Sequence, residues 1–367
     1  METQIAIAGI AAPTGEEGDR AAWVAERFAL LGLRNVEIDS AGNAIGRRPG
    51  RGNGRPIAVC AHLDTVFPRG TAHTVRRNGQ RYVGPSITDN SRGVAAMLAV
   101  IEALGVGAGG AGSPMDFVGT TGEEGAGDLR GAKHYFATRG ADAQAAIIID
   151  GAGDERIVHR ALGSRRFRAT FDGPGGHSWS AFGAPNAVHA AAAAATAIAA
   201  VPLPRSPRTT ITVSRIGGGL SVNSIPQHAW LEIDLRSSSA AVLGTTSARI
   251  AEIIREATIA ENQRSAPGMS PLRSTVVSIG DRQCGDVAES DPLVQLAIRT
   301  TGEAGREPDL AMSSTDANVP ISLGIPAIAI GAGGKGGDTH TTSEWFENVD
   351  GMRGVARAMA ILVDIAG

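Results

Sequence analysis

Short apolar runs recur in both end regions of this chain, and most of them lead into an acidic residue or a histidine. Such runs occur at residues 56–60 (PIAVC), 115–119 (MDFVG), 145–149 (AAIII) and 326–330 (PAIAI). Apolar runs of this length without alternation are typical of strands buried on both faces of a mostly parallel sheet. Residues 17–32 and 93–104 have apolar positions at helical spacing. The two ends therefore predict an α/β domain, with a mostly parallel sheet covered by helices.

The middle of the chain has a different pattern. Residues 165–171, 209–215 and 228–235 alternate between apolar and polar side chains, as half-exposed strands do. Helical segments separate the first two and follow the third, and 274–279 is a last strand. The order strand, helix, strand, strand, helix, strand predicts an inserted α+β domain (βαββαβ), with helices on one face of an antiparallel sheet.

The length of 367 residues favours two domains over one. We expect one domain formed by residues 1–161 plus 285–367, and an inserted domain at 162–284. Helical periodicity resumes near Asp291, which supports the second boundary.

Charge and composition exclude several classes of partner. A net charge of −3 gives no electrostatic basis for binding nucleic acid or an anionic membrane. No apolar run reaches the ~18 residues of a membrane span, and the first residues have no basic segment typical of a secretory signal. Cys60 and Cys284 are the only cysteines, which favours a reducing compartment. We therefore expect a cytoplasmic protein.

Four of the predicted strands end near a residue that could bind a metal. The first leads to His62, the second to Glu123 and Glu124, the third to Asp150, and the fourth, through a glycine loop, to His340. In open α/β sheets, functional groups gather at the carboxyl ends of the strands. We therefore expect these side chains to converge on one crevice.

Each of these residues also has an ordinary structural explanation. A histidine after a strand is commonly solvated or part of the core, and Glu123–Glu124 could be an exposed acidic pair in a first helical turn. Asp89 could be a helix N-cap, and Asp150 could be a turn residue. These explanations do not account for the placement of all the residues where one site would form.

His62 and Asp64 lie two residues apart on an extended segment, so their side chains face the same side. Asp64 could accept a hydrogen bond from the His62 ring and thereby fix the nitrogen that faces a metal. Two histidines with three carboxylates suit Zn²⁺, Co²⁺ or Mn²⁺ better than Ca²⁺ or Mg²⁺.

The chain resembles the zinc-dependent exopeptidases and N-acyl-amino-acid hydrolases, a family that includes tripeptide aminopeptidase, carboxypeptidase G and aminoacylase-1. The resemblance spans nearly the whole chain, and the ordered set of motifs is more specific than any one of them. The motifs are AHLDTVF (61–67), GPSITDNSRG (84–93), TTGEEGAGD (120–128), IIIDG (147–151), GPGGHSW (173–179), SVNSIP (221–226) and DTHTTSEW (338–345).

The resemblance implies two divalent cations per chain, zinc first, with cobalt or manganese as alternatives. It implies that Asp89 bridges the two ions. The other implied ligands are His62 and Asp150 on one ion, and Glu124 and His340 on the second. Glu123 would be the general base, and Asp64 would orient His62.

The inserted domain resembles the lid and dimerisation domain of the family. By this resemblance the protein is a homodimer, His177 reaches the active site of the partner protomer, and Asn223 contacts substrate. From the residues alone, His177 is a turn histidine. Arg236 could bind a substrate carboxylate or be an ion-paired strand end, and Lys335 could touch substrate or be solvated.

The residue types fit amide hydrolysis. An amide carbonyl is a poor electrophile, and water is a poor nucleophile near neutral pH. Two metals can polarise the carbonyl and lower the pKa of a bridging water, while a carboxylate that binds no metal accepts the proton. A structural metal site would not need Glu123 beside Glu124, so Glu123 is the more informative residue.

Three functions fit the sequence. The first is a peptidase, either an aminopeptidase or a dipeptidase. GPGGHSW, STDAN (314–318) and DTHTTSEW favour the tripeptide-aminopeptidase branch. The second is an N-acyl-amino-acid deacylase or other small-amide hydrolase with the same ligands. The third is a metal-binding or scaffold protein without activity, which the complete ligand set and Glu123 disfavour.

Overall fold

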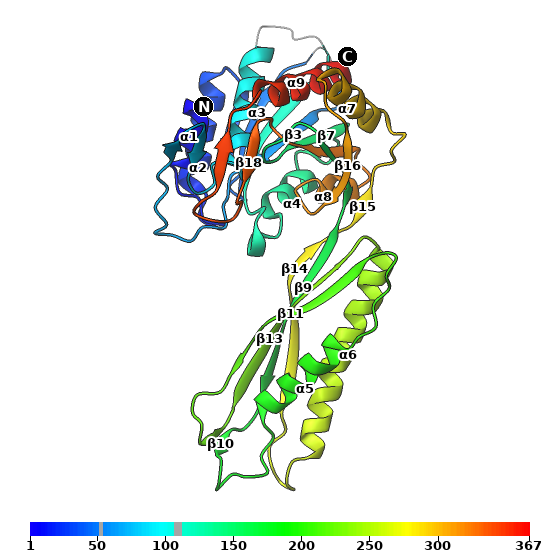
Figure 1. Cartoon of the computed structure of the whole chain (residues 1–367). Coiled ribbons are helices and arrows are strands. Elements are labelled where there is room, and N and C mark those ends of the chain that lie inside the picture. The colour runs from blue at the N-terminus through cyan, green and yellow to red at the C-terminus, as the bar shows by residue number, and fades with distance from the viewer. Residues whose placement is uncertain (51–53, 106–111) are drawn as a thin grey trace. The chain divides into compact units, whose positions relative to one another are not determined.

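Two segments that are distant in sequence form one structural unit. The computed structural model describes residues 1–50, 54–105 and 112–367 (Figure 1). One unit contains Met1–Ala161 and Asp286–Gly367, and a second unit contains Leu162–Gly285. The predicted fold class is confirmed: the first unit has a mixed, mostly parallel sheet, and the inserted unit is built on antiparallel sheet.

The first unit is organised around its large sheet. Its strands, in spatial order, are β1 (Arg34–Ile38), β2 (Ala44–Arg48), β6 (Met115–Thr120), β3 (Ile57–His62), β7 (Ala145–Ile149), β17 (Ala327–Ile330), β8 (Arg156–Ala161) and β15 (Gly285–Asp286), and β16 (Asp309–Ser313) pairs with β8. The neighbours β6, β3, β7 and β17 are mutually parallel. Every residue of β3, β6, β7 and β17 is buried, as the uninterrupted apolar runs predict. Burying one such Ile or Val side chain contributes about 1.5–3 kcal/mol.

Helices pack around this sheet and contribute to its core. They are α1 (Glu2–Ala8), α2 (Gly18–Leu30), α3 (Ser91–Leu104), α4 (Arg130–Ala137), α7 (Pro292–Glu303), α8 (Asn318–Ser322) and α9 (Met352–Ala366), with the 3-10 helix η1 (Gly125–Gly127). Local sequence sets several of their ends. Gly32, with φ 84°, follows α2. Asp291 caps α7, which has proline in its first turn.

A second, small sheet of the first unit carries the glycine loop that precedes His340. It pairs β18 (Lys335–Gly337), β19 (Trp345–Glu347), β5 (Arg81–Val83) and β4 (Arg76–Asn78) in that order. Phe346 at its centre is fully buried against Ala8 and Ile87. The hairpin of β18 and β19 therefore holds the segment that contains His340 between two paired strands.

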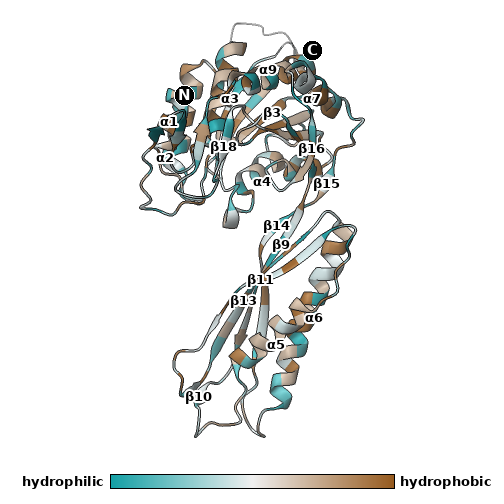
Figure 2. Cartoon of the chain, in the orientation of Figure 1, coloured by the Kyte–Doolittle hydropathy of each residue, from teal (hydrophilic) through white to brown (hydrophobic). Residues whose placement is uncertain are grey.

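The inserted unit has an antiparallel sheet with two helices on one face (Figure 1). The sheet order is β11 (Thr209–Gly218), β13 (His228–Ser237), β9 (Gly163–Asp172) and β14 (Arg273–Arg282). The helices are α5 (Ala187–Ala199) and α6 (Ala240–Gln263), and β10 (Gly176–His177) pairs with β12 (Ser224–Ile225). Alternate residues of β13 are buried, and they pack against α5 and α6 in a separate core. Figure 2 shows hydrophobic and hydrophilic residues interleaved along α6, as expected for a helix with one buried side, whereas α5 is mostly hydrophobic.

Across the described parts of the chain, no helix has the length and the apolar character needed to cross a membrane.

Candidate metal centre

The sheet topology brings the predicted ligands to one edge. His62 is the last residue of β3, and Asp150 directly follows β7. Glu123 and Glu124 follow β6, which is the neighbour of β3 on the other side. His340 follows β17 through the hairpin strand β18. Because these four strands are adjacent and parallel, their carboxyl ends form one crevice.

Asp89 lies at the centre of the group and contacts both histidines. Its Oδ1 is 2.9 Å from Nε2 of His62, and its Oδ2 is 3.1 Å from Nε2 of His340. Nε2 of His62 is also 3.7 Å from Oδ1 of Asp150, and Nε2 of His340 is 3.0 Å from Oε1 of Glu124. The structure thus brings all five predicted ligands together, with one histidine and one further carboxylate on each side of Asp89.

The donor set fits divalent cations. Ligand atoms of His62, Asp89 and Glu124 all lie within 4.8 Å of one another. Oδ1 of Asp89 is buried and accepts no hydrogen bond among the described residues, although the His62 ring is close to it. A buried carboxylate oxygen without a hydrogen bond is costly unless a cation lies beside it. His62, Asp89 and Glu124, extended by Asp150 and His340, could therefore hold metal.

The electrostatics show how strongly this site attracts positive charge. Burial lowers the pKa of His62, but the nearby carboxylates of Asp150, Asp64 and Asp89 outweigh burial and raise the pKa well above its usual value. The hydrogen bond to Asp89 raises the pKa of His340 to about 9. Burial and the charge of Asp89 raise the pKa of Glu124 to about 7. In the metal-free protein, bound protons therefore neutralise the negative charge of carboxylates that a bound cation would otherwise neutralise.

Asp64 has a wider role than its expected contact with His62. Nδ1 of His62 is 3.1 Å from the backbone carbonyl of Asp64 and 3.6 Å from its carboxylate Oδ1. The carboxylate accepts hydrogen bonds from the backbone N–H groups of Glu123 (2.8 Å) and Glu124 (2.9 Å), and from Oγ1 of Thr14 (2.8 Å). Asp64 therefore fixes the His62 ring through its main chain and the Glu123–Glu124 segment through its side chain.

The segment that carries Asp89 is held by its neighbours. Asn90, and not Asp89, is the N-cap of α3, because its Oδ1 accepts from the backbone N–H of Gly93. The same oxygen accepts from the N–H of Gly151, and Nδ2 of Asn90 donates to the carbonyl of Ile149. Asn90 thus ties the start of α3 to the end of β7 and leaves the Asp89 side chain available to ligands.

Glu344 is a site residue that sequence analysis missed. Its Oε1 accepts hydrogen bonds from the backbone N–H groups of Thr88 (2.6 Å) and Asp89 (2.8 Å). Burial raises its pKa to about 7. Glu344 belongs to the DTHTTSEW motif, but it follows no predicted strand, so the argument from strand ends could not select it.

Asp316 is a second missed residue. It is 1% exposed, and its Oδ2 accepts a hydrogen bond from Oγ1 of Thr120, the residue paired with His62 across β6 and β3. Burial raises the pKa of Asp316 to about 6. Its position in the STDAN segment was the available signal, but no residue in that segment pointed to a metal or a base.

His340 has an unusual backbone conformation. Its φ is 67°, and that of Asp338 is 55°. Residues other than glycine rarely adopt this left-handed region, and where they do the surrounding structure holds them. The side chain is 51% exposed, so one side of the candidate centre is open to solvent.

On the inserted unit, the structure brings His177 and Asn223 together. Strands β10 and β12 pair antiparallel, with His177 opposite Ser224. The backbone N–H of Ser178 donates to the carbonyl of Asn223 (2.9 Å). Arg236 lies eight residues beyond His228 on β13, roughly 26 Å along an extended strand. Nε of Arg236 donates to Asp234 at 2.7 Å, so Arg236 occurs as an ion-paired strand end.

Comparisons with known proteins agree with these observations. Residues 58–365 match the model of peptidase family M20/M25/M40. The aminopeptidase PepT of Bacillus cereus is 23% identical, with a TM-score of 0.76 and coverage of 100% of this chain and 98% of that one. A Staphylococcus aureus tripeptidase is 21% identical, with a TM-score of 0.78 and coverage of 100% and 97%.

A related fold also occurs in an amidase. An amidase of the hydantoinase/carbamoylase family from Burkholderia vietnamiensis is 17% identical, with a TM-score of 0.70 and coverage of 98% of this chain and 93% of that one. Among curated proteins, none matches the chain significantly. These structural likenesses establish a shared fold.

Proposed function

Because the chain belongs to peptidase family M20/M25/M40, and is thus a metal-dependent hydrolase of peptide or amide bonds, we propose that it is a dinuclear exopeptidase of short peptides. The observation that carries the proposal is the arrangement around Asp89. One carboxylate oxygen faces His62 and the other faces His340. Asp150 and Glu124 complete the two sides. A bridging carboxylate with matched ligands on both sides is the arrangement that two cations need.

The proposed ligands are His62 and Asp150 for one ion, Glu124 and His340 for the other, and Asp89 for both. When bound, two divalent cations polarise the scissile carbonyl and lower the pKa of water. Imidazole and carboxylate donors favour zinc, with cobalt and manganese as alternatives.

Glu123 is the proposed general base. It is 6% exposed and directly precedes Glu124, and its backbone is fixed by Asp64. In this position Glu123 accepts a proton from the attacking water and returns it to the leaving amine, so that each turnover regenerates the carboxylate. Asp64 keeps Glu123 and His62 in place and does not contact substrate.

His177 is proposed to donate a hydrogen bond to the developing oxyanion in a partner protomer. Its Nδ1 accepts from the backbone N–H of Trp179 (3.2 Å), so the neutral ring carries its proton on Nε2 and can donate from there. The proposal includes a homodimer formed through the inserted unit. Asn223, beside His177, is the proposed substrate contact.

Arg236 is the weaker candidate for a substrate contact, because Asp234 already pairs with it. The cytoplasm remains our proposed location. Cys60 is buried in the first unit and Cys284 lies in the inserted unit, and two thiols in different units agree with a reducing compartment.

A peptidase can be separated from a deacylase by one substrate panel. The chelated protein is reloaded with Zn²⁺, Co²⁺ or Mn²⁺ and assayed on dipeptides, tripeptides, and N-acetyl- and N-carbamoyl-amino acids. We expect the highest kcat/KM on peptides with a free N-terminus. Turnover restricted to N-acyl or N-carbamoyl substrates would replace the peptidase with an amidohydrolase, and metal binding without turnover of any amide would contradict both.

A further inference from the structure

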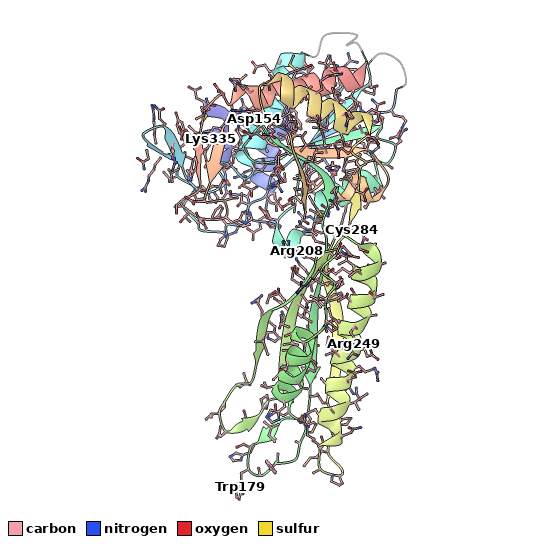
Figure 3. All side chains as sticks on the ribbon, turned by 45° about the vertical axis from the view of Figure 1, so that its right-hand side comes forward. Asp154, Trp179, Arg208, Arg249, Cys284 and Lys335 are labelled. Atoms are coloured by element: carbon pink, nitrogen blue, oxygen red, sulfur yellow. The ribbon has the colours of Figure 1, made fainter. Side chains whose placement is uncertain are left out.

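A pocket of about 580 Å³ is lined by Asp89 and Asp150, and also by charged residues outside the metal centre. These charged residues include Asp154, Arg156 and Lys335, and Figure 3 labels Asp154 and Lys335. The volume lies in the range of small-molecule sites. The pocket therefore adjoins the proposed reaction centre and has charged residues of its own.

Arginines already compensate the acidic side chains of this pocket. Nε of Arg306 donates to Oδ1 of Asp154 at 3.0 Å and lies 3.6 Å from Oε1 of Glu155. Arg357 is buried, donates to the main-chain carbonyl of Asp154, and interacts electrostatically with both acids. Two acids thus interact with two guanidinium groups.

Two cations of the pocket have no such compensation. The Arg156 side chain is exposed and, among the described residues, donates only to the carbonyl of Met312, at 3.4 Å. Lys335 is exposed, and its cross-strand neighbour Glu347 pairs instead with Arg81. Among the residues that the structure describes, neither Arg156 nor Lys335 has a carboxylate partner. The pocket therefore has positive charge available to a ligand.

The residue type at position 335 is itself informative. The chain contains 34 lysines and arginines, of which only Lys133 and Lys335 are lysine. Lys133 forms an ion pair with Asp128 at 2.5 Å. Lys335 is thus the lysine whose ammonium group remains available, and it lines the pocket beside the metal centre.

The backbone of Lys335 is held close to Asp89. A Cβ added to Gly336 would lie 2.6 Å from Cγ2 of Thr88, so β18 packs directly on the segment that precedes Asp89. With consecutive Cα atoms about 3.8 Å apart, Lys335 and Asp89 are separated by a distance on the order of 10 Å. This distance suits a ligand with one group at the metal centre and an acidic group one side chain away.

We infer that this pocket selects substrates with an acidic side chain on one of the two residues that flank the scissile bond, and that Lys335 binds this carboxylate. Arg156 adds positive charge to the lining of the same pocket. The inference rests on the proposed peptidase function and narrows its substrate class. Lysine suits this role because its flexible stem can carry a single charge to a carboxylate.

Matched peptides test the selectivity. The pairs Asp-Leu-Gly with Asn-Leu-Gly, and Leu-Glu-Gly with Leu-Gln-Gly, differ in charge but hardly in shape. For one pair we expect the kcat/KM of the acidic peptide to be roughly ten-fold higher than that of its amide counterpart. This factor corresponds to one weak hydrogen bond to a charged group. Lys335→Gln should bring this ratio close to one, Lys335→Arg should retain most of it, and the control Lys133→Gln should leave it unchanged.

Chemical labelling gives a readout that does not depend on turnover. Lysine acetylation is followed by mass spectrometry in the Glu123→Gln variant, with each of the four peptides present in turn. We expect one acidic peptide to slow the labelling of Lys335 and its amide counterpart to have no effect. Lys133 in the same molecule should be labelled at an unchanged rate and serves as the internal control.

The outcomes separate the two proposals. If all four peptides are cleaved, but both ratios are near one and no peptide protects Lys335, the inference is wrong and the peptidase stands. An equal loss on all peptides in Lys335→Gln would also overturn it, because Lys335 would then bind a group common to every peptide. If no amide is cleaved, the proposed peptidase function is wrong. Protection of Lys335 by an acidic peptide, but not by its amide counterpart, would still support the inference, and no protection would contradict it.

Discussion

The carboxylate of Asp64 accepts a hydrogen bond from the backbone N–H of Glu123 at 2.8 Å, although 59 residues separate the two. The second oxygen of the same carboxylate accepts a hydrogen bond from the backbone N–H of Glu124. One fully buried side chain therefore positions both the proposed base and a proposed ligand. Its hydrogen bonds go to the backbone of these two residues and not to their carboxylates.

Asp64→Asn should destabilise the protein and impair catalysis together. An asparagine has one acceptor oxygen, so its NH₂ group would face a backbone N–H that loses its acceptor. Loss of such a charged hydrogen bond costs about 1.5–3 kcal/mol. The free energy of unfolding in urea and kcat are measured for Asp64→Asn and for Thr14→Val, which removes a single hydroxyl donor. An equal effect of the two variants would contradict the role assigned to Asp64.

Substitution of Glu123 should impair catalysis, whereas substitution of Glu124 should impair metal binding. Glu123→Gln should lower kcat by a factor of at least ~100, the usual contribution of a positioned acid or base, and keep its metal. Glu124→Gln should lower the metal content instead, because its carboxylate contacts His340. Elemental analysis and kcat are measured on both variants. Metal loss in Glu123→Gln, with an unchanged rate per bound ion, would reverse the two assignments.

Metal affinity should fall as the pH falls below about 9, because hydrogen bonding to Asp89 raises the pKa of His340 to about 9. Below that pH a cation must displace this proton, and it must also displace the proton that His62 retains through its raised pKa. Each displaced proton weakens apparent affinity about ten-fold per pH unit. Below pH 7 the dependence should steepen, since Glu124 has a pKa of about 7.

Competition with a chromophoric chelator at pH 6, 7, 8 and 9 measures this dependence. His340→Gln serves as the comparison, because it removes one titrating group and should flatten the slope by about one proton. An affinity that stays constant from pH 6 to 9 in the unchanged protein would rule out the protonated metal-free site.

The sequence was sufficient to predict the sheet and the convergence at its edge. Strands β3, β7 and β17 are short, apolar and fully buried, so the pattern that identifies them depends on local residues alone. Their parallel order places His62 and Asp150 together, as the general rule for open sheets requires. Buried strands followed by acids were thus a reliable signal.

The residues that hold the ligands could not be predicted in the same way. Glu344 reaches the backbone of Asp89 across 255 residues, and Asp316 reaches Thr120 across 196. Such contacts depend on how the loops fold back over the sheet, which local periodicity does not encode. Likewise, the carboxylate of Asp64 was expected beside His62, and it lies 3.6 Å from the ring, but local sequence did not indicate its hydrogen bonds to Glu123, Glu124 and Thr14.

Gly93→Ala should damage the metal centre from a distance. An added Cβ would lie 2.1 Å from Oδ1 of Asn90 and 2.4 Å from the carbonyl of Ile149, so the cap beside Asp89 must move. Overpacking of this kind costs about 1–3 kcal/mol. We expect lower thermal stability and weaker metal binding. Gly302→Ala on α7 is the control, since the space there is open and the change should stabilise the helix by up to about 1 kcal/mol.

The proposed dimer can be tested by complementation. If His177 serves the partner's site, His177→Ala should lower kcat by roughly 10²–10³, as loss of an oxyanion donor does, with unchanged metal content. A heterodimer of His177→Ala with Glu123→Gln then has one site with both residues intact and one site with neither. Co-refolding the two variants should restore about a quarter of the wild-type activity by statistical pairing in a symmetric dimer. If heterodimers are confirmed by mass and no activity returns, His177 acts within its own chain or has no catalytic role.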